Sequence, residues 1–465
     1  MSLKAFLFKI SRSKGGGVIG RWAYILCSGF VSLVFRLTTE IRSVYLAGSM
    51  SNGDIAPGLS DIDFVIVIKD LSALDEYRLI NRLETKLRYL LPPFGKDKLG
   101  THVLIYSAGE WALVGDLFSG KSYGRPRKLF QKDEMIYSHT FGRIVKGLHH
   151  FYKAHWRLEA IQQNLGYQAD NGLERALRER VLERSFQSIE NGFREARKDE
   201  ETPAPYVSLR NEIRKLMSKT DKTDSLYEMI LIRLLHFFDI SAGICFPDSP
   251  QEEREDITMK APVNMESEKH RSKEFMTGVP EAIEREVRTH SILFSRMMYD
   301  DVYLYDPAYY KTSEKLIGYY SGKRERSLRV MSRDRFEKFC LTLPEDSVRF
   351  IDIRNGEPLT LTGKLCTDGL LIRTYAIFPQ LRCPRNLEDY GRYESFRNNA
   401  ERLVRGFEVA NIREPAYEAL QAAVVKENAM NRDEKSVYDR YLDLRALSEA
   451  LRNNLMEFLS SDHEN

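Results

Sequence analysis

Residues 45–68 read YLAGSMSNGDIAPGLSDIDFVIVI and contain a Gly-Ser pair, a polar loop and an acid pair that opens an apolar run. Five apolar residues follow one another from Phe64 to Ile68, which is typical of a strand covered on both faces. Residues 48–60 are rich in Gly, Ser, Asn, Asp and Pro, so they predict a loop. The stretch therefore predicts a strand end, a loop and a buried strand in succession.

The flanking sequence extends this pattern. Residues 21–40 are apolar on most sides and predict a buried helix, and residues 43–47 predict a short strand. Ser72 with Asp75 resembles a capping box at the start of a helix, and residues 102–106 predict the next strand. The order helix, strand, loop, strand, helix, strand indicates a small mixed α/β unit with a covered sheet.

Asp61 and Asp63 are separated by one residue at the start of the predicted buried strand. Side chains alternate along a strand, so both carboxylates should point to the same face. Two like charges this close repel each other, and divalent cations between them relieve the repulsion. Because Mg²⁺ prefers one or two carboxylates completed by water and substrate phosphates, the pair predicts a metal site.

Gly48 and Ser49 directly follow the preceding strand. A glycine there lets backbone N–H groups approach a phosphate, and the serine hydroxyl adds a donor. A short helix starting at Ser49 would favour the same anion. The stretch thus predicts a phosphate-binding turn at Gly48 and Ser49 opposite a metal site at Asp61 and Asp63.

These residues resemble the polymerase-β-like nucleotidyltransferase superfamily. Its signature is Gly-Ser after a strand, then a loop, then an acid-x-acid pair at the start of the next strand. The resemblance implies two Mg²⁺ ions and a nucleoside triphosphate (NTP), with in-line attack by an acceptor hydroxyl and release of pyrophosphate. The metal ligands it implies are Asp61 and Asp63, and the nucleotide-binding residues are Gly48, Ser49 and Ser60.

The resemblance covers roughly residues 20–120 and also implies a third acid on the following strand. Residues 101–106 read THVLIY, so His102 stands where that acid is expected. A neutral histidine can act as general base near pH 7, although it is not the usual Mg²⁺ ligand. His102 is therefore a candidate catalytic residue, with a structural histidine as the equal alternative. The nearest acids are Asp97 and Glu110.

Residues 115–122 read GDLFSGKS and fit the P-loop pattern GxxxxGK[ST]. No clean apolar strand leads into Gly115, and Gly124 and Pro126 interrupt the helix that should follow the motif. A helix from about residue 108 to residue 120 is the better interpretation.

Charge is nearly balanced over the whole chain. The 465 residues include 70 Lys and Arg and 67 Asp and Glu, so nothing global favours a nucleic-acid partner. The first 45 residues differ, with seven Lys or Arg and a single acid, Glu40. A second basic cluster could contact a triphosphate or simply be a solvated linker: Lys121, Arg125, Arg127 and Lys128.

Cysteine content and hydropathy bear on the compartment. Five scattered cysteines without a CxxC pair suit a reduced cytoplasm and predict neither disulfides nor a zinc site. The longest uncharged apolar stretch, residues 22–35, has 14 residues. A membrane span needs about 20, so we expect a buried helix and no span. His149, His150 and His155 are expected to be ordinary helix residues.

We predict an α+β protein with a small mixed-sheet nucleotidyltransferase domain, a helical domain and a C-terminal α+β region. The expected boundaries are 20–125, 126–246, a linker at 247–274, and 275–465. In the last region, residues 302–305, 348–353, 359–361 and 370–378 are strand-like, and residues 394–409 and 436–458 are helical.

The favoured hypothesis is a metal-dependent nucleotidyltransferase that moves a nucleoside monophosphate, AMP foremost, from NTP to a hydroxyl of a small molecule or protein. One alternative is a regulatory protein that keeps the fold and the nucleotide site but has lost catalysis. The other is a P-loop NTPase.

Overall fold

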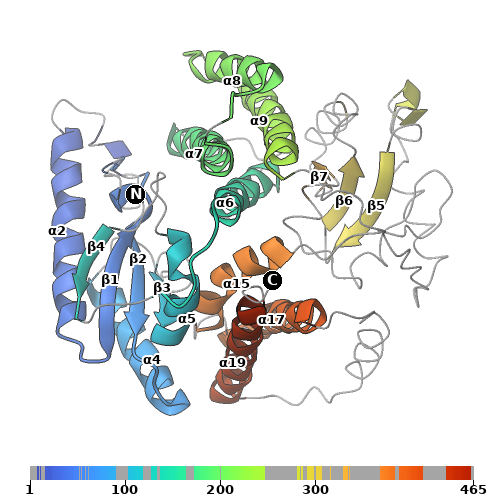
Figure 1. Cartoon of the computed structure of the whole chain (residues 1–465). Coiled ribbons are helices and arrows are strands. Elements are labelled where there is room, and N and C mark those ends of the chain that lie inside the picture. Colours follow the sequence, from blue (N-terminus) through green and yellow to red (C-terminus); the bar gives the residue numbers. More distant parts are fainter. Residues whose placement is uncertain are drawn as a thin grey trace. The chain divides into compact units, whose positions relative to one another are not determined.

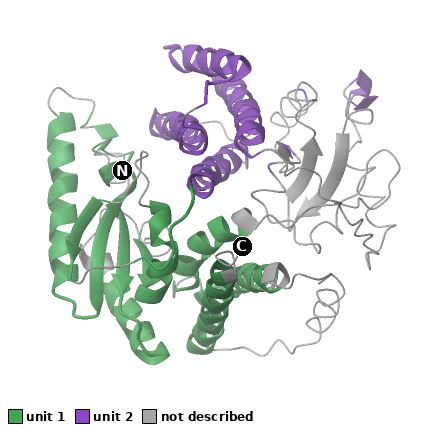
Figure 2. Cartoon of the chain, viewed as in Figure 1, with its two compact units in different colours: residues 1–142, 370–465 green, residues 143–369 purple. Residues whose placement is uncertain are grey.

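The computed structural model describes these ranges, with a few single residues between them: 16–51, 62–90, 103–118, 127–132, 137–163, 172–198, 200–221, 223–246, 291–297, 300–305, 328–332, 367–382, 387–411 and 436–461. The chain divides into two compact units (Figure 2). Unit 1 comprises Met1–Gly142 and Leu370–Asn465, and unit 2 comprises Arg143–Gly369. Unit 1 therefore combines two segments that are far apart in the sequence.

A four-stranded mixed sheet forms the centre of unit 1 (Figure 1). Its strands are β1 (Ile41–Ala47), β2 (Asp63–Ile68), β3 (Val103–Ser107) and β4 (Arg127–Gln131). The order is β3-β2-β1-β4; β2 and β3 run parallel, whereas β1 is antiparallel to both β2 and β4. The mixed sheet and the order of its elements are confirmed.

Helices cover this sheet. They are α2 (Gly16–Arg36), α3 (Gly48–Ser51), α4 (Ala73–Leu90), α5 (Ala108–Val114) and the 3-10 helix η2 (Gly115–Phe118). Helix α2 packs on the sheet through Phe35, whose ring meets that of Phe64 edge-on. The prediction of a buried helix is wrong for its other face, where Leu26 is 68% exposed. Apolar composition alone does not say how many sides of a helix the fold covers.

The C-terminal part of unit 1 is helical where the structure describes it. It contains α15 (Thr367–Leu381), α17 (Tyr390–Asn411) and α19 (Val437–Ser461). The expected strand at residues 370–378 is wrong, because these residues lie in α15. Leu370, Thr374 and Phe378 are fully buried at intervals of four, which is a helical period. The helices at 394–409 and 436–458 are confirmed.

The structure groups α15, α17 and α19 with the N-terminal sheet. The sequence predicts a separate region for them, which begins at residue 275. The expected domain boundaries themselves stay a prediction. The expected linker at 247–274 and the strand-like runs at 348–353 and 359–361 lie outside the described residues.

The described part of unit 2 contains four long helices and a small sheet. The helices are α6 (Arg143–Gln163), α7 (Gly172–Ala196), α8 (Ala204–Met217) and α9 (Asp224–Cys245). The strands β5 (Ser291–Met297), β6 (Asp300–Tyr305) and β7 (Leu328–Ser332) lie in that order. Gly192 lets α6 and α7 approach, since a Cβ there would lie 2.7 Å from the ring of Phe151.

Helix α6 buries histidines inside unit 2. His149, His150 and His155 are 1%, 7% and 4% exposed. Burial, together with the charges of Lys153 and Arg157, lowers the pKa of His150 to about 3. Burial also lowers the pKa of Lys153 to about 7. His150 is therefore neutral in the folded protein at pH 7.

Candidate functional site

Gly48 and Asp63 meet at one end of the sheet. Ala47, the last residue of β1, pairs with Asp63, the first residue of β2. Gly48 follows with φ of 61°, a backbone conformation that favours glycine. A Cβ at Gly48 would lie only 2.2 Å from Oδ2 of Asp63. The absence of a side chain at Gly48 therefore makes room for the Asp63 carboxylate.

Ser49 lies in the turn that follows β1. The expected short helix is present as α3, which begins at Gly48 and has four residues. Ser49 is 4% exposed, and the Ser51 hydroxyl donates a hydrogen bond to the Gly48 carbonyl at 2.8 Å. Such a short helix has almost no dipole, so any phosphate contact here would come from individual backbone N–H groups of the turn.

Ser60 holds the loop between β1 and β2. Its hydroxyl accepts a hydrogen bond from the Ala56 amide at 2.9 Å, and its carbonyl accepts one from the Tyr24 hydroxyl at 2.7 Å. Gly20 supports the same loop, since a Cβ there would lie 2.6 Å from the Pro57 ring. Ser60 thus ties the loop to α2, and its contact with a nucleotide stays a prediction.

Two of the predicted site residues, Asp61 and His102, lie outside the described residues. Their roles stay predictions. The described neighbours are Asp63, which is half-buried, and Val103, which begins β3. Val103 pairs with Phe64 of β2, so the starts of the two parallel strands lie side by side.

Glu110 lies at the opposite end of these strands. It belongs to the capping box of α5: its Oε2 accepts from the Ser107 amide at 2.9 Å, and the Ser107 hydroxyl accepts from the Glu110 amide at 3.3 Å. Ser107 pairs with Ile68, five residues along β2 from Asp63. Five strand residues span about 17 Å, so Glu110 does not share a metal site with Asp63.

Arg382, which directly follows α15, neutralises Glu110 and Glu76 together. Its guanidinium lies 2.5 Å from Oε2 of Glu110 and 3.0 Å from Oε1 of Glu76. The arginine is 7% exposed and both glutamates are 2% exposed. Burial by itself would lower the pKa of Arg382, but the two carboxylates hold it above its usual value.

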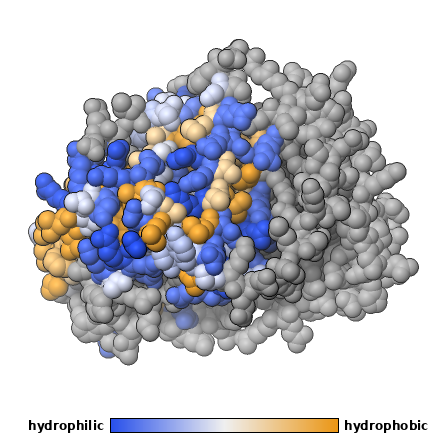
Figure 3. All heavy atoms as spheres, turned by 90° about the horizontal axis from the view of Figure 1, so that it is seen from below, coloured by the Kyte–Doolittle hydropathy of each residue, from blue (hydrophilic) through white to orange (hydrophobic). Residues whose placement is uncertain are grey.

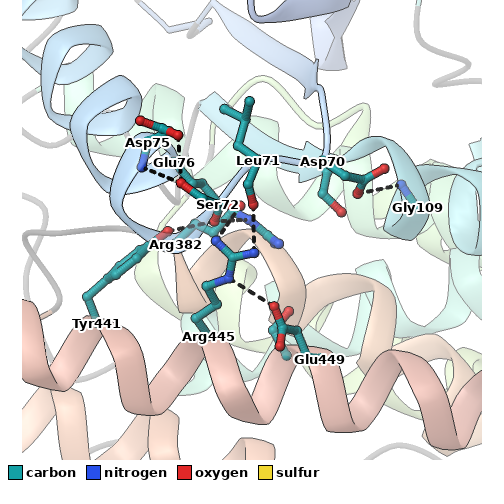
Figure 4. A network of polar contacts seen from close by, with 12 residues as sticks. Asp70, Leu71, Ser72, Asp75, Glu76, Gly109, Arg382, Tyr441, Arg445 and Glu449 are labelled. Atoms are coloured by element: carbon teal, nitrogen blue, oxygen red, sulfur yellow. Dashed lines mark hydrogen bonds and ion pairs between the residues drawn. The ribbon is translucent and has the colours of Figure 1, made fainter.

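Helix α19 completes this network, and Figure 4 shows the part of it that includes Glu76, Tyr441 and Arg445. The Tyr441 hydroxyl donates to Glu76 at 2.7 Å, and Arg445 donates to the Leu71 carbonyl at 2.8 Å. Ser448 donates to Glu110 at 2.6 Å. More than 300 residues separate these partners in the sequence, so no local pattern could have predicted the contacts.

The P-loop interpretation does not agree with the described part of residues 115–122. Helix α5 leads into Gly115, and residues 115–118 continue as η2, so no strand precedes the motif. This confirms the helical interpretation as far as residue 118; residues 119–126 lie outside the described residues, and Lys121 and Arg125 with them.

Arg127 and Lys128 of the basic cluster lie on β4 and are exposed. Arg127 pairs with Leu46, two residues before Gly48. Arg127 therefore lies beside the end of β1 that leads into the Gly48 turn.

A comparison with protein families identifies the N-terminal part of unit 1. Residues 32–103 match the model of a family described as a nucleotidyltransferase domain. The match includes β1, the Gly48 turn, β2 and α4. No curated protein and no solved structure matched the chain. The chain carries a nucleotidyltransferase domain, as its resemblance to the polymerase-β-like superfamily predicted.

Proposed function

We propose that this protein is a metal-dependent nucleotidyltransferase that moves a nucleoside monophosphate, AMP foremost, from NTP to a hydroxyl of a small molecule or protein. The family match supports nucleotidyl transfer in general. The observation that carries the proposal is the corner formed by Gly48 and Asp63, where the carboxylate occupies the space of a missing Cβ. The cysteine pattern supports a cytoplasmic setting, which is part of the proposal.

In this proposal Asp63 and Asp61 would hold Mg²⁺, to which carboxylate oxygens are well suited. The bound metal would offset the charge of the triphosphate. Backbone N–H groups after Gly48 would bind a phosphate, and Arg127 would add positive charge. The acceptor oxygen forms a bond to the α-phosphorus, the bond from that phosphorus to the bridging oxygen breaks, and pyrophosphate leaves. We assign the acceptor's proton to His102.

A second candidate function is nucleotide binding without transfer. Strand β3 reads VLIYS and supplies no carboxylate. Glu110, the next acid along the chain, is held by Arg382 at the other end of the strand. A protein that keeps the nucleotide-binding site but lacks the third acid would act as a regulator by binding the nucleotide without transferring it.

Mg·ATP titration calorimetry, together with pyrophosphate release for each NTP and a panel of hydroxyl acceptors, separates these functions. We expect Asp63→Asn to lower release at least 100-fold, about the effect of removing one electrostatic group from a transition state. Asp70→Asn is the matched control, because Asp70 follows the other end of β2, is exposed, and accepts from the Gly109 amide.

Each outcome decides between the functions. Binding of Mg·ATP without release for any acceptor would support the regulatory alternative. Unchanged Mg·ATP affinity in the double variant Asp61→Asn/Asp63→Asn would contradict the proposed metal site. Loss of nucleotide binding in Lys121→Ala, with binding retained in the double variant, would favour the P-loop.

A further inference from the structure

Helix α2 has a second apolar face, turned away from the sheet. The large apolar side chains on it and just after it are 46–77% exposed: Val18, Ile19, Trp22, Ile25, Leu26, Phe30, Leu33 and Leu37. At 100° per residue they fall within about 140° of the helix circumference, so they form one continuous surface, here called the outer face. Hydrophobic atoms gather at the left edge of Figure 3, the side on which α2 lies in Figure 1.

The outer face is unusual for a protein surface. Contiguous apolar patches of this kind mark contacts with proteins or membranes. Within the described part of the chain, α2 is also the one helix long and apolar enough to cross a membrane, and 28% of its most apolar window is buried. Its length, composition and exposure thus call for a partner that covers it.

The opposite face of α2 is committed to unit 1. Tyr24, Val31 and Phe35 have no exposed surface and spread along the length of the helix. The Tyr24 hydroxyl donates to the Ser60 carbonyl, and Gly20 abuts Pro57. A helix held along one whole side cannot cross a bilayer without leaving its domain, but it can lie in the bilayer surface.

Charge around the outer face indicates the partner. Arg21 and Arg36 are exposed near the two ends of α2. The first 45 residues carry seven Lys or Arg and one acid, Glu40, which forms an ion pair with Arg82 at 2.6 Å. A second copy of the chain would bring like charges together across the contact, whereas an anionic surface would attract them. Trp22, 60% exposed, suits the level of lipid headgroups.

We propose that the outer face of α2 docks unit 1 in the plane of an anionic phospholipid bilayer, with its basic residues on the headgroups. This inference does not depend on the proposed function. Because the inner face of α2 holds the loop that includes Pro57 and Ser60, docking would place the nucleotidyltransferase domain directly on the membrane surface.

Cosedimentation of the full chain with vesicles tests the proposal. We compare two kinds of vesicle. One contains phosphatidylcholine with about 30% phosphatidylglycerol, enough for an anionic surface, and the other contains phosphatidylcholine alone. The variant Ile19→Gln/Leu26→Gln/Leu33→Gln should lower binding to the anionic vesicles at least about tenfold. The matched control Ile144→Gln/Trp156→Gln/Met229→Gln removes similarly exposed apolar groups from unit 2 and should bind like the wild type.

Charge and fluorescence give independent readouts. Arg21→Gln/Arg36→Gln should lower binding to anionic vesicles about 25-fold, because each basic residue contributes about fivefold. The weak binding to neutral vesicles should stay unchanged. In a Trp156→Phe background, Trp22 emission should shift to the blue on anionic vesicles, since Trp111 is already buried at 1% exposure.

Three results would overturn the proposal. The first is a wild type that does not bind anionic vesicles and shows no shift of Trp22 emission. The second is equal binding by the α2 variant and its unit 2 control. The third is a dimer in sedimentation that the α2 variant alone converts to a monomer, without vesicle binding; the outer face would then be an interface between copies.

Discussion

The two ends of the parallel strands β2 and β3 both have carboxylates, and their surroundings differ. At the C-terminal end Glu76 and Glu110 are 2% exposed and share the guanidinium of Arg382. At the N-terminal end Asp63 is half-buried against the bare backbone of Gly48. Removing the internal arginine would leave the two glutamates buried without a cation, whereas the acid beside the glycine turn is the one that we propose binds a ligand.

Replacing Arg382 by Met should have the largest effect on stability. The variant leaves Glu76 and Glu110 buried without their cation, which costs about 3–5 kcal/mol. Urea unfolding followed by circular dichroism measures the loss. Arg392→Met is the control, because Arg392 forms an ion pair with Asp389 in which both side chains are about 60% exposed. Its loss of unfolding free energy should stay below about 0.5 kcal/mol. Equal effects in the two variants would mean that the buried cluster does not hold unit 1 together.

Glu110→Gln tests whether the two strand ends are functionally separate. The substitution weakens the pair with Arg382, and we expect a stability loss of about 1–3 kcal/mol. Pyrophosphate release per folded molecule should stay within about twofold of the wild type, because Glu110 lies about 17 Å along the strands from Asp63. A 100-fold loss of release in the folded variant would instead make Glu110 part of the transfer site.

Acidification should weaken unit 2, which has its own buried ionisable groups. The pKa of His150 is lowered to about 3 in the folded chain, against 6.5 ordinarily. Between these values the unfolded chain binds more protons, so stability present at pH 7 is lost as pH falls through this window. From pH 7 to pH 5 the loss from this group is about 2 kcal/mol.

His150→Gln should remove that part of the pH dependence. The quantity to compare is the difference in unfolding free energy between pH 7 and pH 5. A loss of packing caused by the substitution lowers both free energies equally, so it does not affect this difference. An unchanged difference in the variant would show that His150 does not carry the effect; burial also lowers the pKa of His236, to about 4, and that group would be the next to replace.

The sequence was sufficient for the local part of the fold. The run from Phe64 to Ile68, the Gly48 turn and the capping serine Ser72 each determine their element through neighbours in the chain. Together with the strand-like residues 43–47 and 102–106, they predict strands β1 to β3 and helix α4 within a few residues. The position of Asp63 beside Gly48 depends in addition on the antiparallel pairing of Ala47 with Asp63.

Contacts between distant segments could not be predicted in this way. Residues 370–378 include Ile372, Tyr375 and Ile377, which favour strands, but packing of Leu370 and Phe378 in unit 1 selects a helix. The pairing of Glu76 with Arg382 joins positions 306 residues apart. A single sequence contains no signal for it.

Two glycine substitutions test the central claim most directly. Gly48 and Gly53 both have positive φ, 61° and 74°, so alanine strains the backbone at either position by about 1–2 kcal/mol. A Cβ at Gly53 meets nothing within 4 Å, whereas a Cβ at Gly48 would lie 2.2 Å from the Asp63 carboxylate. We predict that Gly48→Ala lowers NTP-dependent pyrophosphate release at least about 100-fold, while Gly53→Ala stays within about threefold of the wild type. Equal rates in the two variants would contradict a nucleotide site built on Gly48 and Asp63.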